Sequence, residues 1–269
     1  MLELFHAAPS YFSMVARLAL AEAQLPTTSR LLDIHLAKQQ LSPAYRRLNP
    51  HMTVPTLRGP GLLLTDSAQI LAFAAEHAAE RWADADPTRR DGIASAVAGH
   101  YSLNIEALTF SKLLSTRPWF RPVVVRLLGG IISRLEAEAR RSPDQADALL
   151  AKAQQNRERL ALFRDQQPAE LLATQRQAVS SYLASLPAVV ASGGLFGSRV
   201  SSADVVLAVL CSRLEMAREQ ALLSRPDLQG WWQRYRQRPA VASADLWTRF
   251  QRRRFVQAVL EARHTPINP

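Results

Sequence analysis

The chain has 269 residues, of which 48% are hydrophobic, so it can bury a core and is not a disordered polypeptide. It has one cysteine, Cys211, which excludes an internal disulfide and a cysteine-rich metal site and indicates a reducing, cytoplasmic setting. The formal net charge is +10, and because residues 1–80 hold six basic and six acidic residues, the whole excess follows residue 80.

The first 80 residues are predicted to alternate between strands and helices. The expected strands are short apolar or alternating runs: Leu2–Ala7, Arg30–Leu36, Val54–Arg58 and Leu62–Thr65. The expected helices are Phe12–Gln24, Ser42–Leu48, and one that opens at Asp66 or Ser67 and runs to about His77. A strand–helix–strand start followed by a hairpin predicts an α/β domain, with a mixed sheet and helices on its faces.

After residue 80 the alternation stops, and residues 88–269 are predicted to be all-α. The expected helices are Arg89–Leu114, Val123–Arg141, Ala146–Arg164, Glu170–Leu186, Ser202–Arg218, a short one around Trp231–Arg236, and Leu246–Arg263. The boundary is placed near Arg81–Pro87, where a polar segment ends in proline. The excess positive charge is therefore expected on a solvated, arginine-rich helical surface.

A Val-Pro step, Val54–Pro55, lies where a loop enters a predicted strand. Proline cannot donate to a sheet ladder and is confined to edges, strand starts and bulges. In a cis bond, the N–H and C=O of Val54 would be unpaired and could bind the backbone of a peptide, as an added strand does. Because about one X–Pro bond in twenty is cis, this segment alone predicts an ordinary trans proline.

A second pair of residues, Asp66–Ser67, lies where the last predicted strand becomes a helix. Free N–H groups at a helix N-terminus attract carboxylates, and an adjacent aspartate can hold an ammonium group, so together they suit an amino-acid head group. Taken alone, the step is an ordinary helix cap. Pro55 and Ser67 belong to opposite ends of one hairpin, however, and Ser10 follows the first strand, so all three are expected at one sheet edge.

These motifs resemble the cytosolic glutathione transferase superfamily throughout the first 80 residues. The family pattern is a serine, cysteine or tyrosine after the first strand, an Asn-Pro loop into a Val-Pro turn, and an acidic residue and serine opening the third helix. Residues 10–17 resemble the zeta-class serine motif and the matching segment of the reductive-dehalogenase branch, and residues 39–50 resemble the theta-class segment. The resemblance implies a thioredoxin-like domain over residues 1–80 and an all-α domain over residues 88–269.

The resemblance also implies a site. Ser10 would donate a hydrogen bond to the glutathione sulfur, with Tyr11 and Ser13 within reach of the same turn. Glutathione binding would fall to Gln40, Thr53, Val54, Pro55, Asp66 and Ser67. Among these, the Val54 backbone would pair with the cysteinyl unit, Asp66 and Ser67 would hold the γ-glutamyl end, and Gln40 would meet the glycine carboxylate. A pocket for an apolar electrophile would be lined by Tyr11, Phe12, Tyr101 and Phe110.

The C-terminal half carries further family features. Residues 197–204 resemble the family's capping box, in which Ser201 caps a helix and Asp204 returns a bond to the Ser201 N–H. Residues 238–241 match the family's C-terminal pattern after a tryptophan-containing helix. The resemblance is weak over residues 115–165, which are expected to be an insertion between the helices.

The expected function is that of a glutathione transferase, which activates a thiolate for attack on a small electrophile. Phe12 stands where the dehalogenase branch has cysteine, which favours conjugation, addition or isomerisation over enzyme-thiol chemistry. A glutathione-dependent isomerase or dehalogenase, and a non-catalytic binding protein with the same fold, remain alternatives. A homodimer is expected from the resemblance. The histidines show no metal-ligand spacing, and no apolar window or basic aromatic strand predicts membrane or nucleic-acid binding.

Overall fold

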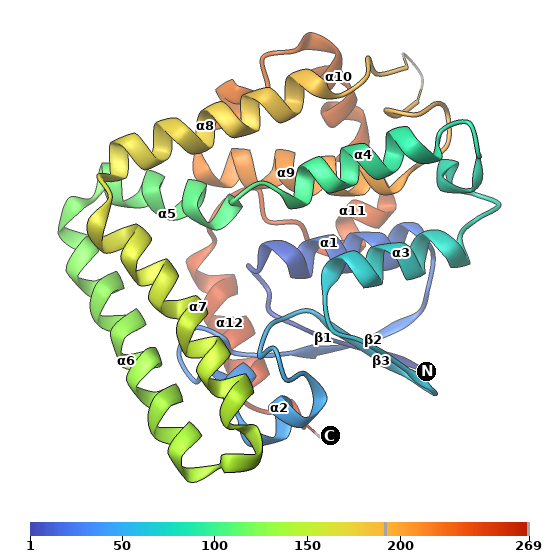
Figure 1. The fold of residues 1–269 in the computed structure, drawn as a ribbon. Helices are drawn as coiled ribbons and strands as arrows, with labels where there is room; N and C mark the ends of the chain where they lie inside the picture. Colours follow the sequence, from blue (N-terminus) through green and yellow to red (C-terminus); the bar gives the residue numbers. More distant parts are fainter. Residues whose placement is uncertain (191–192, 268–269) are drawn as a thin grey trace. The chain divides into compact units, whose positions relative to one another are not determined.

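In a computed structural model, which describes residues 1–190 and 193–267, the chain forms two compact units. The first takes in residues 1–49 and 53–103 and the described part of 180–269, and the second takes in residues 50–52 and 104–179. Figure 1 traces the chain through both. The helices that follow residue 80 are therefore shared between the units, because some of them pack with helices or a strand of the first 80 residues.

The first unit contains a four-stranded mixed sheet, as predicted. Its strands are β1 (Leu2–His6), β2 (Thr27–Leu31), β3 (Thr56–Gly59) and β4 (Leu62–Leu64), in the order β2-β1-β3-β4. β1 runs parallel to β2 and antiparallel to β3, and β3 and β4 form an antiparallel hairpin. Phe5 of β1 lies opposite Thr56 of β3, so the end of the first strand meets the start of the third.

Helices cover both faces of this sheet (Figure 1), because successive strand residues point to opposite sides. On one face, α1 (Tyr11–Glu22) and α3 (Ser67–His77) pack together over the sheet. Leu4 and Leu57 contribute to the apolar cluster beneath them. On the other face, Phe5 packs with Tyr45 of α2 (Pro43–Leu48). α2 has the predicted cap, since the Ser42 side chain accepts a hydrogen bond from the Tyr45 N–H and Pro43 opens the helix.

The second strand differs from the prediction: β2 ends at Leu31, and the alternating run after it is a turn. The carboxylate of Asp33 accepts hydrogen bonds from the N–H groups of His35, Leu36 and Ala37, at 2.8 to 2.9 Å. Side-chain acceptors of this kind compete with a sheet ladder for the backbone donors. A 3-10 helix, Gln39–Leu41, follows this turn.

Five further helices of the first unit are α4 (Arg90–Tyr101), α9 (Ser202–Ala217), α10 (Pro226–Tyr235), α11 (Pro239–Ala244) and α12 (Arg252–Ala262). α9 is buried along most of its length and contacts α1, α3 and α4. It opens with the predicted capping box, in which the Ser201 side chain accepts from the Asp204 N–H and the Asp204 side chain accepts from the Ser201 N–H.

Two of the predicted helices differ from the structure by more than a few residues at their ends. The run expected over Arg89–Leu114 is two helices, because Asn104 caps a new one by accepting a hydrogen bond from the Ala107 N–H at 2.9 Å. The helix expected from Leu246 begins only at Arg252. Asp245, with a φ of +56°, ends α11, and the side chain of Trp247 is fully buried, so the chain between these helices is irregular.

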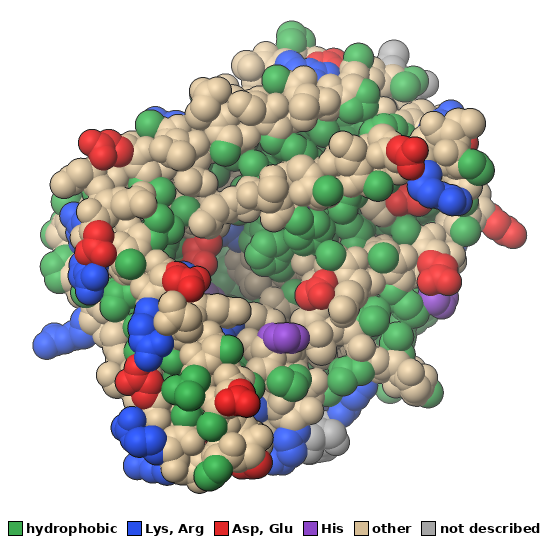
Figure 2. Space-filling view, viewed as in Figure 1, with side chains coloured by type: hydrophobic (Ala, Val, Ile, Leu, Met, Phe, Trp, Pro, Cys, Tyr) green, Lys and Arg blue, Asp and Glu red, His purple; other side chains and the backbone are tan. Residues whose placement is uncertain are grey.

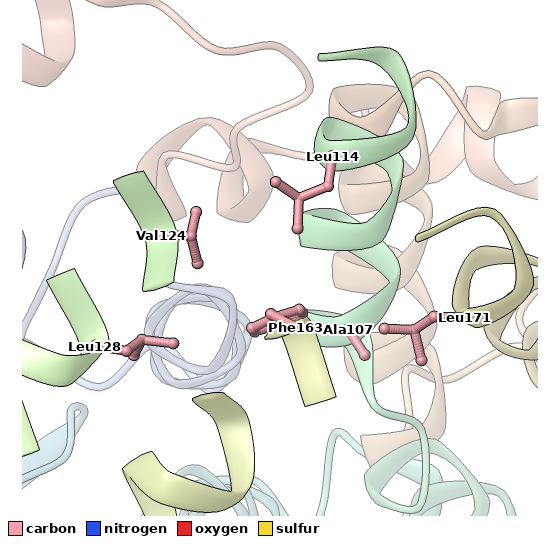
Figure 3. Packing of buried hydrophobic residues seen from close by; sticks show 6 residues of the cluster. All are labelled: Ala107, Leu114, Val124, Leu128, Phe163 and Leu171. Carbon is pink, nitrogen blue, oxygen red and sulfur yellow. The ribbon is translucent and has the colours of Figure 1, made fainter. Parts of the chain in front are cut away.

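The second unit is helical. It contains α5 (Ile105–Thr116), α6 (Arg121–Arg141), α7 (Ala146–Asp165) and the greater part of α8 (Pro168–Ser185). Its core cluster is shown in Figure 3 and comprises Ala107, Leu114, Val124, Leu128, Phe163 and Leu171. Figure 2 shows Lys and Arg side chains interspersed with Asp and Glu over α6 and α7, and two of the ion pairs in this unit join Arg157 to Glu136 and Arg159 to Glu106.

Candidate functional site

The turn between β1 and α1 carries Ser10, the predicted thiol-binding residue. Ser10 is the N-cap of α1, and its Oγ accepts a hydrogen bond from the Ser13 N–H at 3.4 Å. Its own N–H donates to the Ala7 carbonyl at 3.1 Å. Because Oγ is engaged as an acceptor, its hydrogen is left to be donated. The residue is half-buried, so a ligand can reach the hydroxyl.

The two alternatives to Ser10 have different surroundings. Ser13 is fully buried, and its Oγ accepts a hydrogen bond from the Ala7 N–H at 3.2 Å. Tyr11 is also buried, with its hydroxyl 3.3 Å from Nε2 of His100 and its ring stacked on the imidazole. Burial raises the pKa of the Tyr11 phenol well above its ordinary value. Tyr11 and Ser13 are buried, whereas Ser10 is half-buried. Of these three hydroxyls, that of Ser10 is therefore the one a ligand can reach most easily.

The Val54–Pro55 peptide bond is cis, contrary to the trans bond predicted from this segment alone. β3 begins at Thr56, so Val54 lies outside the ladder. Within the described residues, no hydrogen bond engages its N–H or C=O. The register of the sheet places this step beside the end of β1, since Thr56 lies opposite Phe5.

Asn49, which the sequence did not single out, joins the loop before Val54 to the start of α3. It is fully buried. Its Nδ2 donates to the Thr53 carbonyl at 3.0 Å, to Thr56 Oγ1 at 2.9 Å and to the Thr65 carbonyl at 3.1 Å. Tyr45 supports the same loop by donating to the Thr53 carbonyl at 2.7 Å. The Asn-Pro pair belongs to a motif of the sequence, but the sequence does not indicate that the asparagine bonds to Thr65, a residue 16 positions away.

Asp66 and Ser67 lie directly after Thr65. Asp66 is the N-cap of α3, accepting from the Gln69 N–H at 2.9 Å, and it is exposed, so its carboxylate is open to a cation. Ser67 is buried, and its Oγ accepts a hydrogen bond from the Tyr101 hydroxyl at 3.0 Å. The hydrogen of the Ser67 hydroxyl is therefore left to be donated. Burial raises the pKa of Tyr101 to about 12, so that residue stays a donor at neutral pH.

The other predicted glutathione contacts are Thr53 and Gln40. The Thr53 carbonyl is occupied by the Tyr45 and Asn49 donors. Gln40 lies in the 3-10 helix, and its Oε1 is buried without a hydrogen-bond partner among the described residues. An amide oxygen can only accept, so a carboxylate would have to be bound by Nε2 of the same side chain.

The aromatic residues of the predicted electrophile pocket fall in both units. Phe12 is 40% exposed and stacks on Tyr101, with ring centroids 5.9 Å apart and an interplanar angle of 9°. Tyr11 packs edge-on against Phe12, at 5.3 Å. Phe110 belongs to α5 in the second unit, where its ring lies 5.4 Å from that of Phe163. The first three form one aromatic group beside Ser67, and lining of a shared pocket by Phe110 remains a prediction.

Arg17, on the second turn of α1, also supports the Ser10 turn. Its Nη1 donates to the Ala7 carbonyl and its Nη2 to the Ala8 carbonyl, at 3.3 and 3.1 Å. Its remaining N–H groups donate to Nδ1 of His6 and to the carbonyls of Ala244 and Asp245, at 2.6 to 3.0 Å. Since all of these acceptors are neutral, the sequence offered no charge pattern that could have revealed this role.

Two buried histidines make the fold sensitive to acid. Burial lowers the pKa of His100 from 6.5 to about 3 and holds that of His6 well below its ordinary value. Below pH 6.5 the unfolded chain therefore binds more protons than the native one, and stability falls as pH falls. Between pH 6.5 and 4.5 we expect His100 alone to cost about 2 to 3 kcal/mol.

Urea unfolding of the wild type and of His100→Phe at both pH values would measure this effect. The variant should lose less stability between the two pH values, although its stability at pH 6.5 is itself expected to be lower. Equal pH dependence in the two proteins would contradict the assignment to His100.

Other features of the described residues bear on cofactors and membranes. Within the described part of the chain, no group of three or more His, Cys, Asp or Glu side chains is arranged to hold a metal ion. Among the helices between residues 1 and 190 and between 193 and 267, none combines the length and the apolarity needed to cross a bilayer.

Comparison with known proteins identifies the family. Residues 4–82 match the family model for the glutathione S-transferase N-terminal domain, and residues 144–239 match the one for the C-terminal domain. No curated protein sequence matches this chain.

Several solved structures share the fold at low identity. A glutathione transferase homolog from Sulfitobacter, with bound glutathione, is 21% identical with a TM-score of 0.56, over 90% of this chain and 96% of that one. A delta-class glutathione transferase from Nilaparvata lugens is 16% identical with a TM-score of 0.60, over 97% and 100%. The beta-etherase LigF from Sphingobium sp. strain SYK-6 is 19% identical with a TM-score of 0.60, over 90% and 98%.

The chain belongs to the glutathione S-transferase superfamily, as its motifs predicted. Its mixed four-stranded sheet followed by helices is the glutathione transferase fold.

Proposed function

We propose that this protein is a glutathione transferase that activates the glutathione thiol at Ser10 for attack on a small apolar electrophile. The observation that carries the proposal is the half-buried Ser10 hydroxyl at the N-terminus of α1, with its hydrogen free to be donated. The N-terminal end of a helix also carries a partial positive charge that favours an anion. Family membership makes glutathione the expected source of that anion.

The rest of glutathione would extend along the same sheet edge. The unpaired backbone of Val54, beside Pro55, would bind the cysteinyl unit as a short added strand. The exposed Asp66 carboxylate would hold the γ-glutamyl ammonium, and the Ser67 hydroxyl would donate to the carboxylate next to it. Gln40 would meet the glycine carboxylate by donating from its amide Nε2, with Thr53 holding the loop. Residues 1–80 would thus form the glutathione-binding domain.

The reaction class depends on whether the nucleophilic sulfur belongs to glutathione or to a cysteine of the protein. A free cysteine thiol has a pKa near 8.5, so only a few per cent is thiolate at neutral pH. The one cysteine of the chain, Cys211, is fully buried, and burial raises the pKa of its thiol. A mechanism in which a cysteine of the protein attacks the substrate therefore has no accessible sulfur. The thiolate of bound glutathione would instead be the nucleophile. The exposed Phe12 and the stacked Tyr101 offer the electrophile an apolar surface beside it.

Two other functions use the same site. A glutathione-dependent isomerase would require glutathione without consuming it, and a panel of electrophiles with glutathione measured before and after would separate it from a transferase. A binding protein without catalysis would show no turnover on that panel. In the cell, we expect a homodimer in the cytoplasm.

Replacement of Ser10 by alanine tests the proposal. We expect the pH midpoint of thiolate absorbance in the glutathione complex to rise by about one to two units, because the hydrogen bond to the anion is lost. The measurement is an ultraviolet titration of the complex. Ser13→Ala is the matched control, since that hydroxyl is buried and engaged by the Ala7 N–H. An unchanged midpoint in the Ser10 variant would remove Ser10 from the mechanism.

A further inference from the structure

A second arginine, Arg213 of α9, is buried against the Ser10 turn. It is 7% exposed, and its Nη2 donates to the Pro9 carbonyl at 2.9 Å. Its Cζ lies 5.3 Å from the centroid of the Tyr11 ring. The side chain therefore contacts the residues on either side of Ser10.

The charge of Arg213 is not neutralised by any described residue. No carboxylate forms an ion pair with it, and its Nε is buried without a hydrogen-bond partner among the described residues. A buried charge without a partner is costly. The first turn of α1 contains no acidic side chain. A cation at a helix N-terminus is itself unfavourable, because it adds to the positive end of the dipole.

The titratable groups around Tyr11, over whose ring Arg213 lies, are uncharged at neutral pH. Burial raises the pKa values of Tyr11, Tyr182 and Cys211 and lowers that of His100 to about 3. Burial also lowers the pKa of Arg213 to about 10, which leaves the guanidinium protonated below that pH. The charged groups at this turn are thus the two guanidinium groups of Arg213 and Arg17, and the titratable groups around Tyr11 are neutral.

The carbonyl groups of the turn are arranged consistently with an anion site. Three successive carbonyls, those of Ala7, Ala8 and Pro9, each accept from a guanidinium, two from the half-buried Arg17 and one from the buried Arg213. The negative ends of these dipoles are therefore paired with cations. The N–H groups of Tyr11 and Phe12, for which the described residues supply no acceptor, and the hydrogen of the Ser10 hydroxyl remain for a ligand, whereas the Ser13 N–H is bonded to Ser10 Oγ.

We propose that Arg213 is a positioning residue for the bound thiolate, holding the Pro9–Ser10 turn and supplying the positive charge that the sulfur anion compensates. This inference rests on the proposed function, because it concerns the glutathione sulfur at Ser10. Arg213 would thus add the electrostatic effect of a charge on α9 to the hydrogen bond by which Ser10 stabilises the thiolate. The anion in turn relieves the cost of the unpaired guanidinium.

The test compares Arg213→Gln, which removes the charge and keeps an amide donor, with Arg213→Lys, which keeps the charge. In the glutathione complex, we expect the thiolate midpoint of the glutamine variant to rise by about one pH unit, as for a unit charge nearby at an effective dielectric constant of ~20. That of the lysine variant should stay close to the wild-type midpoint. Thermal unfolding checks that both variants are folded.

Other outcomes would overturn the inference. An unmoved midpoint in a folded glutamine variant would leave Arg213 with a packing role. Equal shifts in both variants would assign the effect to the shape of the guanidinium and not to its charge. A wild-type complex whose midpoint equals that of free glutathione would overturn the proposed function itself, so the two failures are distinguishable.

A measurement on the wild type covers the case in which the glutamine variant does not fold. Glutathione sulfonate carries a negative charge at the sulfur, whereas S-methylglutathione is neutral there. We expect the wild type and Arg213→Lys each to bind glutathione sulfonate at least about tenfold more tightly than S-methylglutathione, as measured by calorimetry. The reason is the attraction between the sulfonate and one positive charge, at the effective dielectric constant of ~20 used above. Equal affinities for the two ligands would overturn the inference.

Discussion

Replacing Asp204 by alanine is expected to lower the free energy of unfolding by about 3 to 5 kcal/mol. The carboxylate is 1% exposed and accepts hydrogen bonds from the Ser201 N–H and hydroxyl and from the Leu195 N–H, at 2.6 to 2.9 Å. Alanine would leave two buried backbone donors without acceptors, at a cost of about 1 to 3 kcal/mol each. It would also remove the capping box of α9, against which α1 and α4 pack.

Urea unfolding near pH 7.5 would measure the change, because burial raises the pKa of Asp204 to about 6 and the group is ionised above that value. Ser201→Ala is the matched control, and its expected cost is about 1 to 2 kcal/mol, since Asp204 would still accept two backbone N–H groups. A loss below about 1 kcal/mol for the Asp204 variant would show that water can replace the carboxylate.

Replacing Asn49 by alanine is expected to cost about 3 kcal/mol and to weaken glutathione binding by about tenfold or more. The side chain is fully buried, and its amide joins the Thr53 and Thr65 carbonyls, which adjoin Val54 and Asp66 respectively. Without it, both glutathione-binding segments lose their common support. The carbonyls would also be left without one of their donors.

Calorimetry of glutathione binding and urea unfolding would measure both effects. Tyr45→Phe is the control, because it removes the hydroxyl that bonds to the Thr53 carbonyl and to Thr56 Oγ1 and leaves the Asn49 bond to Thr65 in place. We expect that variant to lose about 1 kcal/mol of stability and to keep most of its affinity. Comparable binding losses in both variants would mean that the connection to Thr65 is unimportant.

The parts of the fold that the sequence predicted well are those determined by local chemistry. The capping box at Ser201 and Asp204 and the Ser42–Pro43 helix start have residue types whose function depends on neighbours three or four positions away. The mixed sheet followed from the order of apolar runs. The second strand was misplaced because Leu32 and Ile34 continue its alternation, whereas the Asp33 carboxylate had already engaged the backbone donors.

The candidate site was predictable only in part, for a related reason. Ser10, Val54 and Asp66 lie at turns, and turn residues are recognisable in a sequence. Arg17 and Arg213 bind backbone carbonyl groups, and every residue has a backbone carbonyl whatever its side chain. Since no complementary side chain marks the partner, a sequence does not reveal which arginine will be buried beside which turn.

The contacts of Arg17 also have a consequence for the order in which the site is completed during synthesis. Its guanidinium bonds to the Ala244 carbonyl, which belongs to a residue 227 positions later in the chain. At ~5–20 residues per second, the ribosome adds that residue about 10 to 45 s after Arg17. Throughout that interval the nascent N-terminal segment contains an arginine that lacks two of its native acceptors, the carbonyls of Ala244 and Asp245. The guanidinium that supports the Ser10 turn therefore completes its hydrogen bonds only after residue 245 has been added.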